Sequence, residues 1–222
     1  MSESPSRLIR SSDPTQPYLP RRKIPGNEPP VRIFKQDWLE NLTFTSLKKF
    51  LMFCVSFEVI VLSIAVFYGI SLCKFFIYFM TALILWFITE YLLHRFVFHF
   101  ASEKKEIQRL VYIFHGNHHI QPNHPYRTLM PIIVSLPIGL IIWGGSIYVC
   151  GISAGSSFFS GFFAGYIFYD CMHFATHNFR MRSFPLSLWK RHHLLHHYQK
   201  EDHNYSISLP WLDILFRSKY KL

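Results

Sequence analysis

Histidine is the residue whose number and spacing most clearly suggest chemistry in this sequence. Thirteen of the 222 residues are histidines, and ten of them fall into four short groups. The groups are His94-Arg-Phe-Val-Phe-His99, His115-Gly-Asn-His118-His119, His173-Phe-Ala-Thr-His177 and His193-Leu-Leu-His196-His197. Neutral imidazoles bind borderline transition metals such as iron, zinc and copper, and they suit calcium and magnesium poorly. Because one ion cannot use ten ligands, the groups predict a site for two metal ions.

The spacing inside the groups fits ligation from helices. Three pairs are four residues apart, which is about one helical turn and places both rings on one face: His115 and His119, His173 and His177, His193 and His197. Adjacent histidines point in different directions, so one helix can serve two metals. His94 and His99 are five residues apart and diverge by about 140° on an ideal helix. We therefore expect the helix to end or bulge at this point.

Two carboxylates precede histidines at short spacing. Glu90 lies one turn before His94, and Asp170 lies three residues before His173. We expect each to accept the ring N–H that faces away from the metal and so to fix the tautomer of the ligand. The three remaining histidines, His124, His192 and His203, are expected to be polar surface residues without a metal role.

The composition indicates a membrane protein. Half of the residues are hydrophobic and 16% are charged, whereas soluble domains have about 25% charged residues. A helix needs about 20 apolar residues to cross a bilayer, and four stretches qualify: 50–72, 75–93, 129–150 and, more weakly, 152–170. In the fourth stretch small residues recur every four positions, which allows close helix approach. We expect an all-α integral membrane protein with four transmembrane helices in two hairpins.

The distribution of positive charge predicts the topology. With four spans, 22 of the 23 Lys and Arg residues lie on one side, which is the cytosolic side by the positive-inside rule. All histidines lie on that side too, whereas three spans would separate the groups. We expect a cytosolic, histidine-rich helical cap that holds a di-metal centre, with both termini cytosolic. The net charge of +10 is attributed to contact with anionic lipid headgroups and not with nucleic acid.

The residues that precede the first span differ in composition from the spans. Residues 1–30 contain seven of the thirteen prolines and are expected to form a disordered cytosolic arm without a secretory signal. Residues 33–49 are expected to form a short amphipathic helix at the membrane interface. Residues 31–222 are expected to form one membrane-embedded domain. The four cysteines show no metal or disulfide spacing and are expected to be buried thiols.

At these motifs the chain resembles the fatty acid hydroxylase superfamily, and within it the fatty acid 2-hydroxylases that act on sphingolipid acyl chains. The resemblance covers residues 32–216 and includes Glu90-Tyr-Leu-Leu-His-Arg-Phe-Val-Phe-His99, Gly165-Tyr-Ile-Phe-Tyr-Asp170 and His193-Leu-Leu-His-His-Tyr198. It implies that the ten grouped histidines are the ligands of two metal ions. It also implies insertion of oxygen from dioxygen at carbon 2 of a very-long-chain fatty acid or ceramide, in the endoplasmic reticulum membrane or, in a bacterium, the inner membrane.

The chain departs from the family pattern at several places. Many relatives carry a fused cytochrome b5 domain; this chain resembles the shorter members, so a separate electron donor such as cytochrome b5 or a ferredoxin is expected. His124 stands where relatives usually have Asp, and Asn204 and Ser206 stand where Gly is common. Iron is the expected working metal because zinc has no redox chemistry, although zinc binds the same imidazoles. No catalytic residue beyond the metal ligands is predicted.

Two alternatives remain open at this point. A sterol oxidase or acyl desaturase of the same superfamily usually has about eight histidines at different spacings. A metal-transporting membrane protein would place ligands near the bilayer midplane, at broken helices between repeats. The acyl chain length, the choice between free acid and ceramide, the stereochemistry and the oligomeric state do not follow from the sequence.

Overall fold

The computed structural model describes residues 29–221, and within that range the chain forms helices and no strands. The predicted arm at 1–30 therefore lies almost wholly outside the described residues. The elements are α1 (Asp37–Leu42), α2 (Leu47–Phe67), α3 (Leu72–Leu92), η1 (Leu93–Phe98), α4 (Lys105–Val111), η2 (Tyr112–Gly116), α5 (Asn117–Ile120), α6 (Ile132–Cys150), α7 (Ile152–Asn178), α8 (Leu186–Tyr198) and α9 (Leu212–Leu215). Both η elements are π-helices.

Three helices are long and apolar enough to cross a membrane. They are α2, the continuous helix of α3 and η1 (Leu72–Phe98), and α6, with mean hydropathies of 2.5, 1.9 and 2.0. They correspond to three of the four predicted stretches, although their ends differ by several residues. The fourth, α7, begins at residue 152 as expected but continues to Asn178. It is not apolar enough to qualify by hydropathy, because Gly, Ser and His interrupt its apolar residues.

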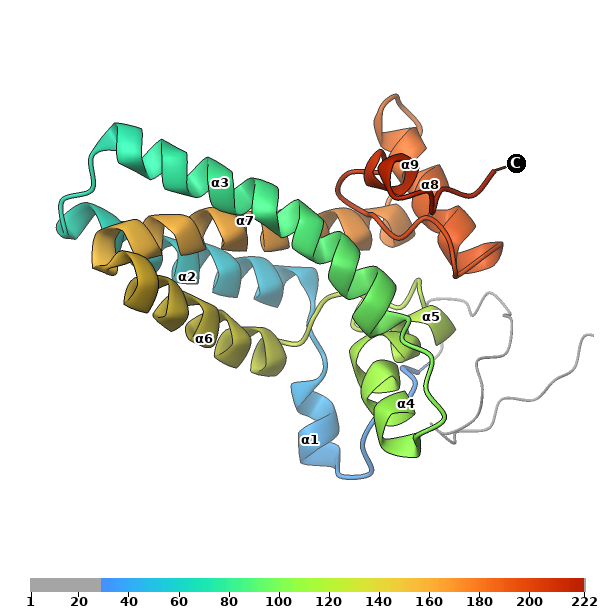
Figure 1. Cartoon of the computed structure of the whole chain (residues 1–222). Helices are drawn as coiled ribbons and strands as arrows, with labels where there is room; N and C mark the ends of the chain where they lie inside the picture. Colours follow the sequence, from blue (N-terminus) through green and yellow to red (C-terminus); the bar gives the residue numbers. More distant parts are fainter. Residues whose placement is uncertain (1–28, 222) are drawn as a thin grey trace, which may run out of the picture.

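Helix α7 lies at the centre of the bundle and packs against α2, α3 and α6 (Figure 1). Its small residues permit this position. A Cβ added at Gly161 would lie 2.7 Å from the carbonyl carbon of Phe79 in α3, and one at Gly165 would lie 2.5 Å from the Trp86 ring. On its other side, Phe159 and Phe163 pack edge-on against Phe57 of α2. Because three apolar helices surround α7, its own surface need not be apolar.

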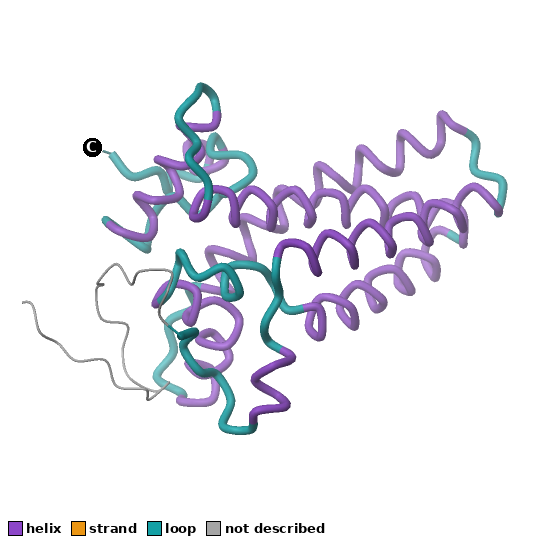
Figure 2. The backbone as a smooth tube through the Cα atoms, turned by 180° about the vertical axis from the view of Figure 1, so that it is seen from behind, coloured by secondary structure: helices purple, strands orange, loops and turns teal. Residues whose placement is uncertain are grey.

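The α2–α3 and α6–α7 links lie at one end of the bundle, and the short helices, including those between α3 and α6, form a cap at the other (Figures 1 and 2). The α2–α3 link and the single linking residue Gly151 lie at the first end. The cap contains α4, α5, α8 and α9, and two of the histidine groups lie in α5 with the turn before it and in α8. The other two lie where η1 and α7 enter the cap.

The segment before α2 differs from the predicted amphipathic helix at 33–49. Only α1 (Asp37–Leu42) forms there, and the chain turns before Ser46 caps the start of α2 by accepting a hydrogen bond from the Lys49 amide. The turn is fixed by Glu40, a buried residue of α1 whose carboxylate pairs with the guanidinium of Arg127. The helix therefore ends close to the buried ion pair that joins α1 to Arg127.

The four cysteines are free thiols. Cys54 is buried and Cys171 is half-buried, but Cys73 and Cys150 are exposed at the ends of α3 and α6. The expectation that all four are buried is therefore wrong for these two, since each lies near the end of a helix and faces outward from the bundle.

Candidate metal centre

Ten histidines converge in two groups of five, and they are the ten singled out from the sequence. In each group the potential ligand atoms lie within 4.8 Å of one another. The first five-histidine group consists of His94, His99, His115, His119 and His196. The second five-histidine group consists of His118, His173, His177, His193 and His197. The adjacent pairs His118-His119 and His196-His197 are divided between the groups, as expected for neighbours that point in different directions.

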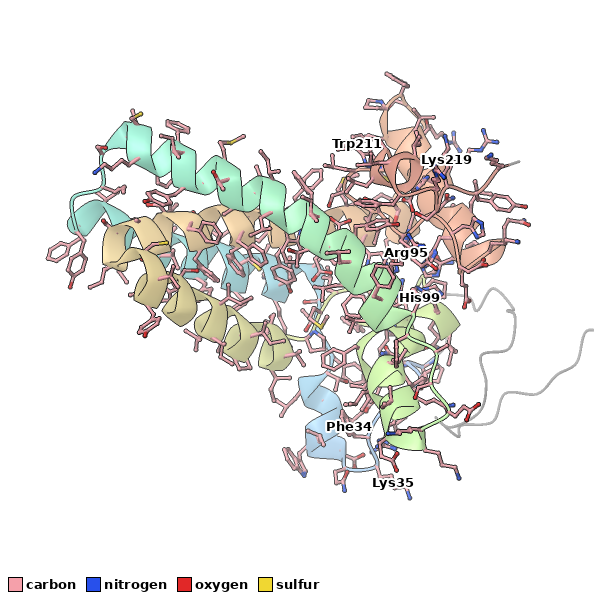
Figure 3. All side chains as sticks on the ribbon, in the orientation of Figure 1. Phe34, Lys35, Arg95, His99, Trp211 and Lys219 are labelled. Carbon is pink, nitrogen blue, oxygen red and sulfur yellow. The ribbon has the colours of Figure 1, made fainter. Side chains whose placement is uncertain are left out.

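The first group depends on a π-helix. A π-helix has i→i+5 hydrogen bonds, so residues five apart come to lie on one face. η1 contains His94 and ends just before His99, and the Nε2 atoms of these two residues are 3.2 Å apart. The expectation that the helix ends or bulges at this point is therefore confirmed. Nε2 of His115 lies 3.0 Å from that of His94 and 2.8 Å from that of His119. Figure 3 shows His99 at the cap end of the helix formed by α3 and η1.

The second group joins α5, α7 and α8. Nε2 of His118 lies 2.8 Å from that of His173 and 3.1 Å from that of His197. Nε2 of His177 lies 2.8 Å from that of His193 and 3.2 Å from that of His197. The one-turn spacing of His173 and His177 on α7, and of His193 and His197 on α8, brings both members of each pair to the same point.

The separations fit ligand shells. Two nitrogens at about 2.1 Å from one metal, at a right angle, are about 3.0 Å apart. The Nε2–Nε2 distances range from 2.8 to 3.2 Å. In His196 the Nδ1–H donates to the carbonyl of His203 at 2.7 Å. Its other ring nitrogen, Nε2, is buried and has no hydrogen-bond partner among the described residues. Because Nδ1 has the proton, Nε2 presents its lone pair to the first group. The donor set therefore fits a metal ion in each group.

The protonation states agree with this assignment. Burial lowers the pKa of His118 to about 3, and the neighbouring His94 adds a smaller lowering effect. Burial also lowers the pKa of His119 to about 3 and that of His197 well below its usual value. The rings are therefore neutral at physiological pH, which is the state that binds metals.

The outer nitrogens of the first group contact the chain that follows α8. Nδ1 of His94 donates to the backbone carbonyl of Tyr205, and Nδ1 of His119 lies 3.4 Å from the carboxylate of Glu201. With His196 bound to His203, three of its five rings are held by residues 201–205. A contact of this kind fixes the tautomer and orientation of a ligand.

The two carboxylates singled out from the sequence are buried near the centre but have other partners. Glu90 accepts hydrogen bonds from the amides of Ile207 and Ser208, each at 2.8 Å. Asp170 accepts one from the amide of Met130 at 3.1 Å. The expected direct contact of Glu90 with His94 is not present, because the Tyr205 carbonyl occupies that nitrogen. Both carboxylates instead fix the backbone of segments next to the centre.

The three remaining histidines differ from the expectation that they lie on the surface. His124 and His192 are buried, and only His203 is partly exposed. Nε2 of His192 lies 3.0 Å from the carboxylate of Asp213. Sequence reasoning missed Asp213, which is fully buried. The available signal was a lone acid within the apolar run from Trp211 to Leu215.

A cavity opens beside both groups. His115 of the first group and His118 and His173 of the second line it. The remaining wall combines apolar and polar side chains, which include Phe98, Phe114, Leu129, Met130, Tyr169 and Asp170. The cavity therefore borders histidines of both five-histidine groups.

Comparisons with known proteins agree with this arrangement. The chain is 28% identical over 185 residues to a dihydroceramide fatty acyl 2-hydroxylase of Arabidopsis thaliana, with 83% of this chain and 78% of that protein covered. It is 32% identical over 142 residues to a ceramide very long chain fatty acid hydroxylase of Schizosaccharomyces pombe, with 63% of this chain and 41% of that protein covered. It is 32% identical over 149 residues to the human fatty acid 2-hydroxylase, with 63% and 38% covered.

A solved structure shares the fold. It is that of full-length scs7p, in which only the hydroxylase domain is visible, and it matches with a TM-score of 0.76 at 26% identity over 83% of this chain and 70% of that one. The fatty acid hydroxylase family matches residues 79–218, which include all ten grouped histidines. With most of its length matched in this way, the chain belongs to the fatty acid hydroxylase family.

Proposed function

We propose that this protein hydroxylates carbon 2 of the fatty acyl chain of a ceramide or a related fatty acid. The observation that carries the proposal is the pair of five-histidine groups in a chain similar to plant and mammalian fatty acid 2-hydroxylases and to a fungal ceramide very long chain fatty acid hydroxylase. The reaction inserts one oxygen atom of dioxygen into a C–H bond. The other oxygen atom leaves as water, with electrons and protons from a separate donor.

The ten grouped histidines are proposed as the ligands of two metal ions. When bound, a redox-active metal pair supplies the activation of dioxygen, which zinc cannot provide because it has no redox chemistry. Iron is therefore the proposed working metal, with zinc as a competing occupant of the same imidazoles. The chain's own contribution is to keep the rings neutral, by burial, and to fix the orientation of His94 and His196 through Nδ1 contacts to the backbone.

The reacting end of the substrate is proposed to reach the cavity beside the two groups. The imidazoles His115, His118 and His173 line one wall, and Phe98, Leu129 and Met130 give the cavity an apolar part. The cavity lies at the cap end of the long helices, where the head of a membrane lipid and its first carbons lie while the tail stays in the hydrocarbon layer. This depth favours reaction close to the polar head over reaction far along the chain.

The topology is proposed to have four spans, with α7 as the fourth. Its 27 residues exceed the span requirement of about 20, and its central position among three apolar helices explains its low hydropathy. The cap and both termini are then cytosolic by the positive-inside rule. We further propose an endoplasmic reticulum membrane, a cytosolic arm at 1–30, a hydroxylase domain at 31–222, and a separate electron donor such as cytochrome b5.

The alternatives from sequence receive less support. A metal transporter would bind ions near the midplane, whereas both histidine groups lie in the cap at the helix ends. A sterol oxidase or an acyl desaturase would share the metal site and differ in product. Product analysis therefore separates these enzymes.

The decisive experiment expresses the protein in cells that lack 2-hydroxylated sphingolipids and analyses their lipids by mass spectrometry. We expect 2-hydroxy acyl chains in ceramides with the wild-type protein and none with His118→Ala expressed at the same level. A new double bond, an oxidised sterol or a hydroxyl group far along the acyl chain would contradict the proposal and identify which alternative is correct.

A further inference from the structure

The two five-histidine groups are held in different ways. In the first group, Nδ1 of His94 and His196 donate to the backbone carbonyls of Tyr205 and His203. In the second group the Nδ1 atoms of four rings are buried and have no hydrogen-bond partner among the described residues: His118, His177, His193 and His197. Only the first group is therefore oriented by the segment that follows α8.

This segment, residues 203–208, has no secondary structure of its own and is fixed from outside. Its main anchor is the fully buried carboxylate of Asp213. Oδ1 accepts hydrogen bonds from the amide of Tyr205 and the hydroxyl of Ser218, each at 2.8 Å. Oδ2 accepts one from the amide of Ser206 at 2.8 Å and lies 3.0 Å from Nε2 of His192. All the hydrogen-bonding capacity of this side chain is directed at the segment and its neighbours.

Two further side chains complete the support. Glu90 of α3 accepts hydrogen bonds from the amides of Ile207 and Ser208. Asn204 has a positive φ of 56° and is held by its side chain, which donates to the carbonyl of His192 at 3.1 Å and accepts from the amide of Tyr220 at 2.8 Å. The Tyr205 carbonyl that binds His94 is thus bracketed by anchored residues on both sides.

We propose that Asp213 is a positioning residue for the first metal site, so that the two sites depend differently on the C-terminal segment. Asp213 fixes the Tyr205 and Ser206 amides, this fixes the Tyr205 carbonyl, and the carbonyl orients His94. No ring of the second site has a hydrogen bond to residues 203–208 among the described residues, and Asp213 approaches that site only through His192, the neighbour of His193 on α8. The proposal rests on the metal ligation stated above, and it concerns which of the two sites is lost when the segment is released.

The test uses Asp213→Asn in the full-length protein, reconstituted with zinc and purified in detergent. The amide has nearly the shape of the carboxylate, but its NH₂ group faces donors that one carboxylate oxygen accepted, so the segment loses about half of its anchor. Loss of an outer partner of a ligand typically weakens metal binding by about 10–100-fold. Zinc content and the rate of zinc transfer to a chromogenic chelator are measured, so the result does not depend on activity.

We expect about one of the two zinc ions to be released about 10–100-fold faster in Asp213→Asn, with the other unchanged. Ser218→Ala, which removes one donor to Asp213, should give a smaller change in the same direction and guards against misfolding of the stronger variant. The matched control is Asp202→Asn, because Asp202 is exposed and its side chain pairs with that of His203, which is not a proposed metal ligand. It should release both ions as the wild type does.

Two histidine variants assign the release phases. His94→Ala should remove the phase that Asp213→Asn accelerates, and His193→Ala should remove the other. Equal acceleration of both phases in Asp213→Asn and Ser218→Ala, or no acceleration in either, would overturn the positioning role. Wild-type zinc content in both His94→Ala and His193→Ala would instead overturn the ligand assignment, which is a different failure.

Discussion

At the scale of single residues, the centre is built from rings that use one nitrogen each toward a shared point. The adjacent pair His118-His119 shows how few residues this requires, since one short helix, α5, contributes a ring to each group. His196 and His197 do the same from α8. These two pairs make the groups neighbours, so a change that removes one ring can affect both.

Replacement of His177 tests the ligand assignment most directly. Its Nε2 lies within 3.2 Å of the Nε2 atoms of both His193 and His197, so we propose that it is central to the second group. His177→Ala should abolish hydroxylation and lower the bound metal by about one ion. Elemental analysis and lipid product analysis measure the two effects.

His203→Gln is the control for that variant, because the His203 side chain is partly exposed and contacts Asp202 and Tyr220. Its carbonyl, which binds His196, is unchanged by the substitution. Metal content and activity should stay at wild-type values. Full activity and unchanged metal content in His177→Ala would refute the assignment.

The buried rings predict how the metal-free protein responds to pH. The folded pKa of His118 and of His119 is about 3, against about 6.5 in an unfolded chain. The folded pKa is the lower one, so the unfolded state binds more protons between these values. The free energy of unfolding is therefore highest and constant above about pH 6.5, and it falls as the pH decreases toward about 3.

Thermal unfolding of metal-stripped protein measures this effect. The midpoint should be constant above about pH 6.5 and decrease steadily below it. A variant with both His118 and His119 changed to Gln should decrease less steeply over the same range. A midpoint that rises on acidification would contradict the burial of neutral rings.

The residue-scale prediction from sequence was sound where spacing along one helix decides geometry. The ten histidines were grouped by four-residue intervals, by adjacent pairs and by an expected end or bulge of the helix between His94 and His99, and the structure brings them together. The partners of Glu90 do not follow, because Ile207 and Ser208 are more than a hundred residues away in the sequence. The position of Glu90 one turn before His94 could not predict that the carbonyl of Tyr205, from a distant loop, would bind the His94 ring instead.

At the scale of elements, the position of α7 determines that of the centre, because its last turns contribute His173 and His177. The repeat of small residues predicted its close packing, and hydropathy alone would have missed it. The length of α1 was not predictable in the same way. Its end depends on the buried pair of Glu40 with Arg127, and these residues are 87 positions apart in the sequence.

Substitution of Gly161 tests this packing. A Cβ there would lie 2.7 Å from a backbone atom of α3, which cannot rotate away. Overpacking of this kind costs about 1–3 kcal/mol, so Gly161→Ala should lower the thermal midpoint and reduce metal content. Gly144→Ala is the matched control, because that glycine of α6 is exposed and its added Cβ meets nothing within 4 Å. Equal midpoints for the two variants would show that α3 and α7 are not in close contact.

At the scale of the whole molecule, the proposed four spans place both exposed cysteines on the side opposite the cap. Cys73 and Cys150 should react with a membrane-impermeant maleimide only when that side of a sealed vesicle is accessible. A cysteine introduced at the exposed Ser183 of the cap, in a variant without Cys73 and Cys150, should react only from the other side. If α7 does not cross the membrane, all three positions would react from one side.

The charge of the whole molecule bears on the proposed electron donor. Oxygen insertion at an unactivated carbon needs a reductant, and the proposed source is a separate protein that approaches from the cytosol. The net charge of +10 and its concentration in the cap favour an acidic donor, because opposite charges steer association. Iron-loaded protein in lipid should therefore be inactive with dioxygen and ceramide alone, and should form 2-hydroxyceramide when a reduced soluble cytochrome b5 domain is added.

The rate of this reaction should fall as the salt concentration is raised, because salt screens the attraction between the donor and the cap. Product formation without any reductant would contradict the proposed chemistry, whereas a rate independent of salt would contradict only the charge-steered donor.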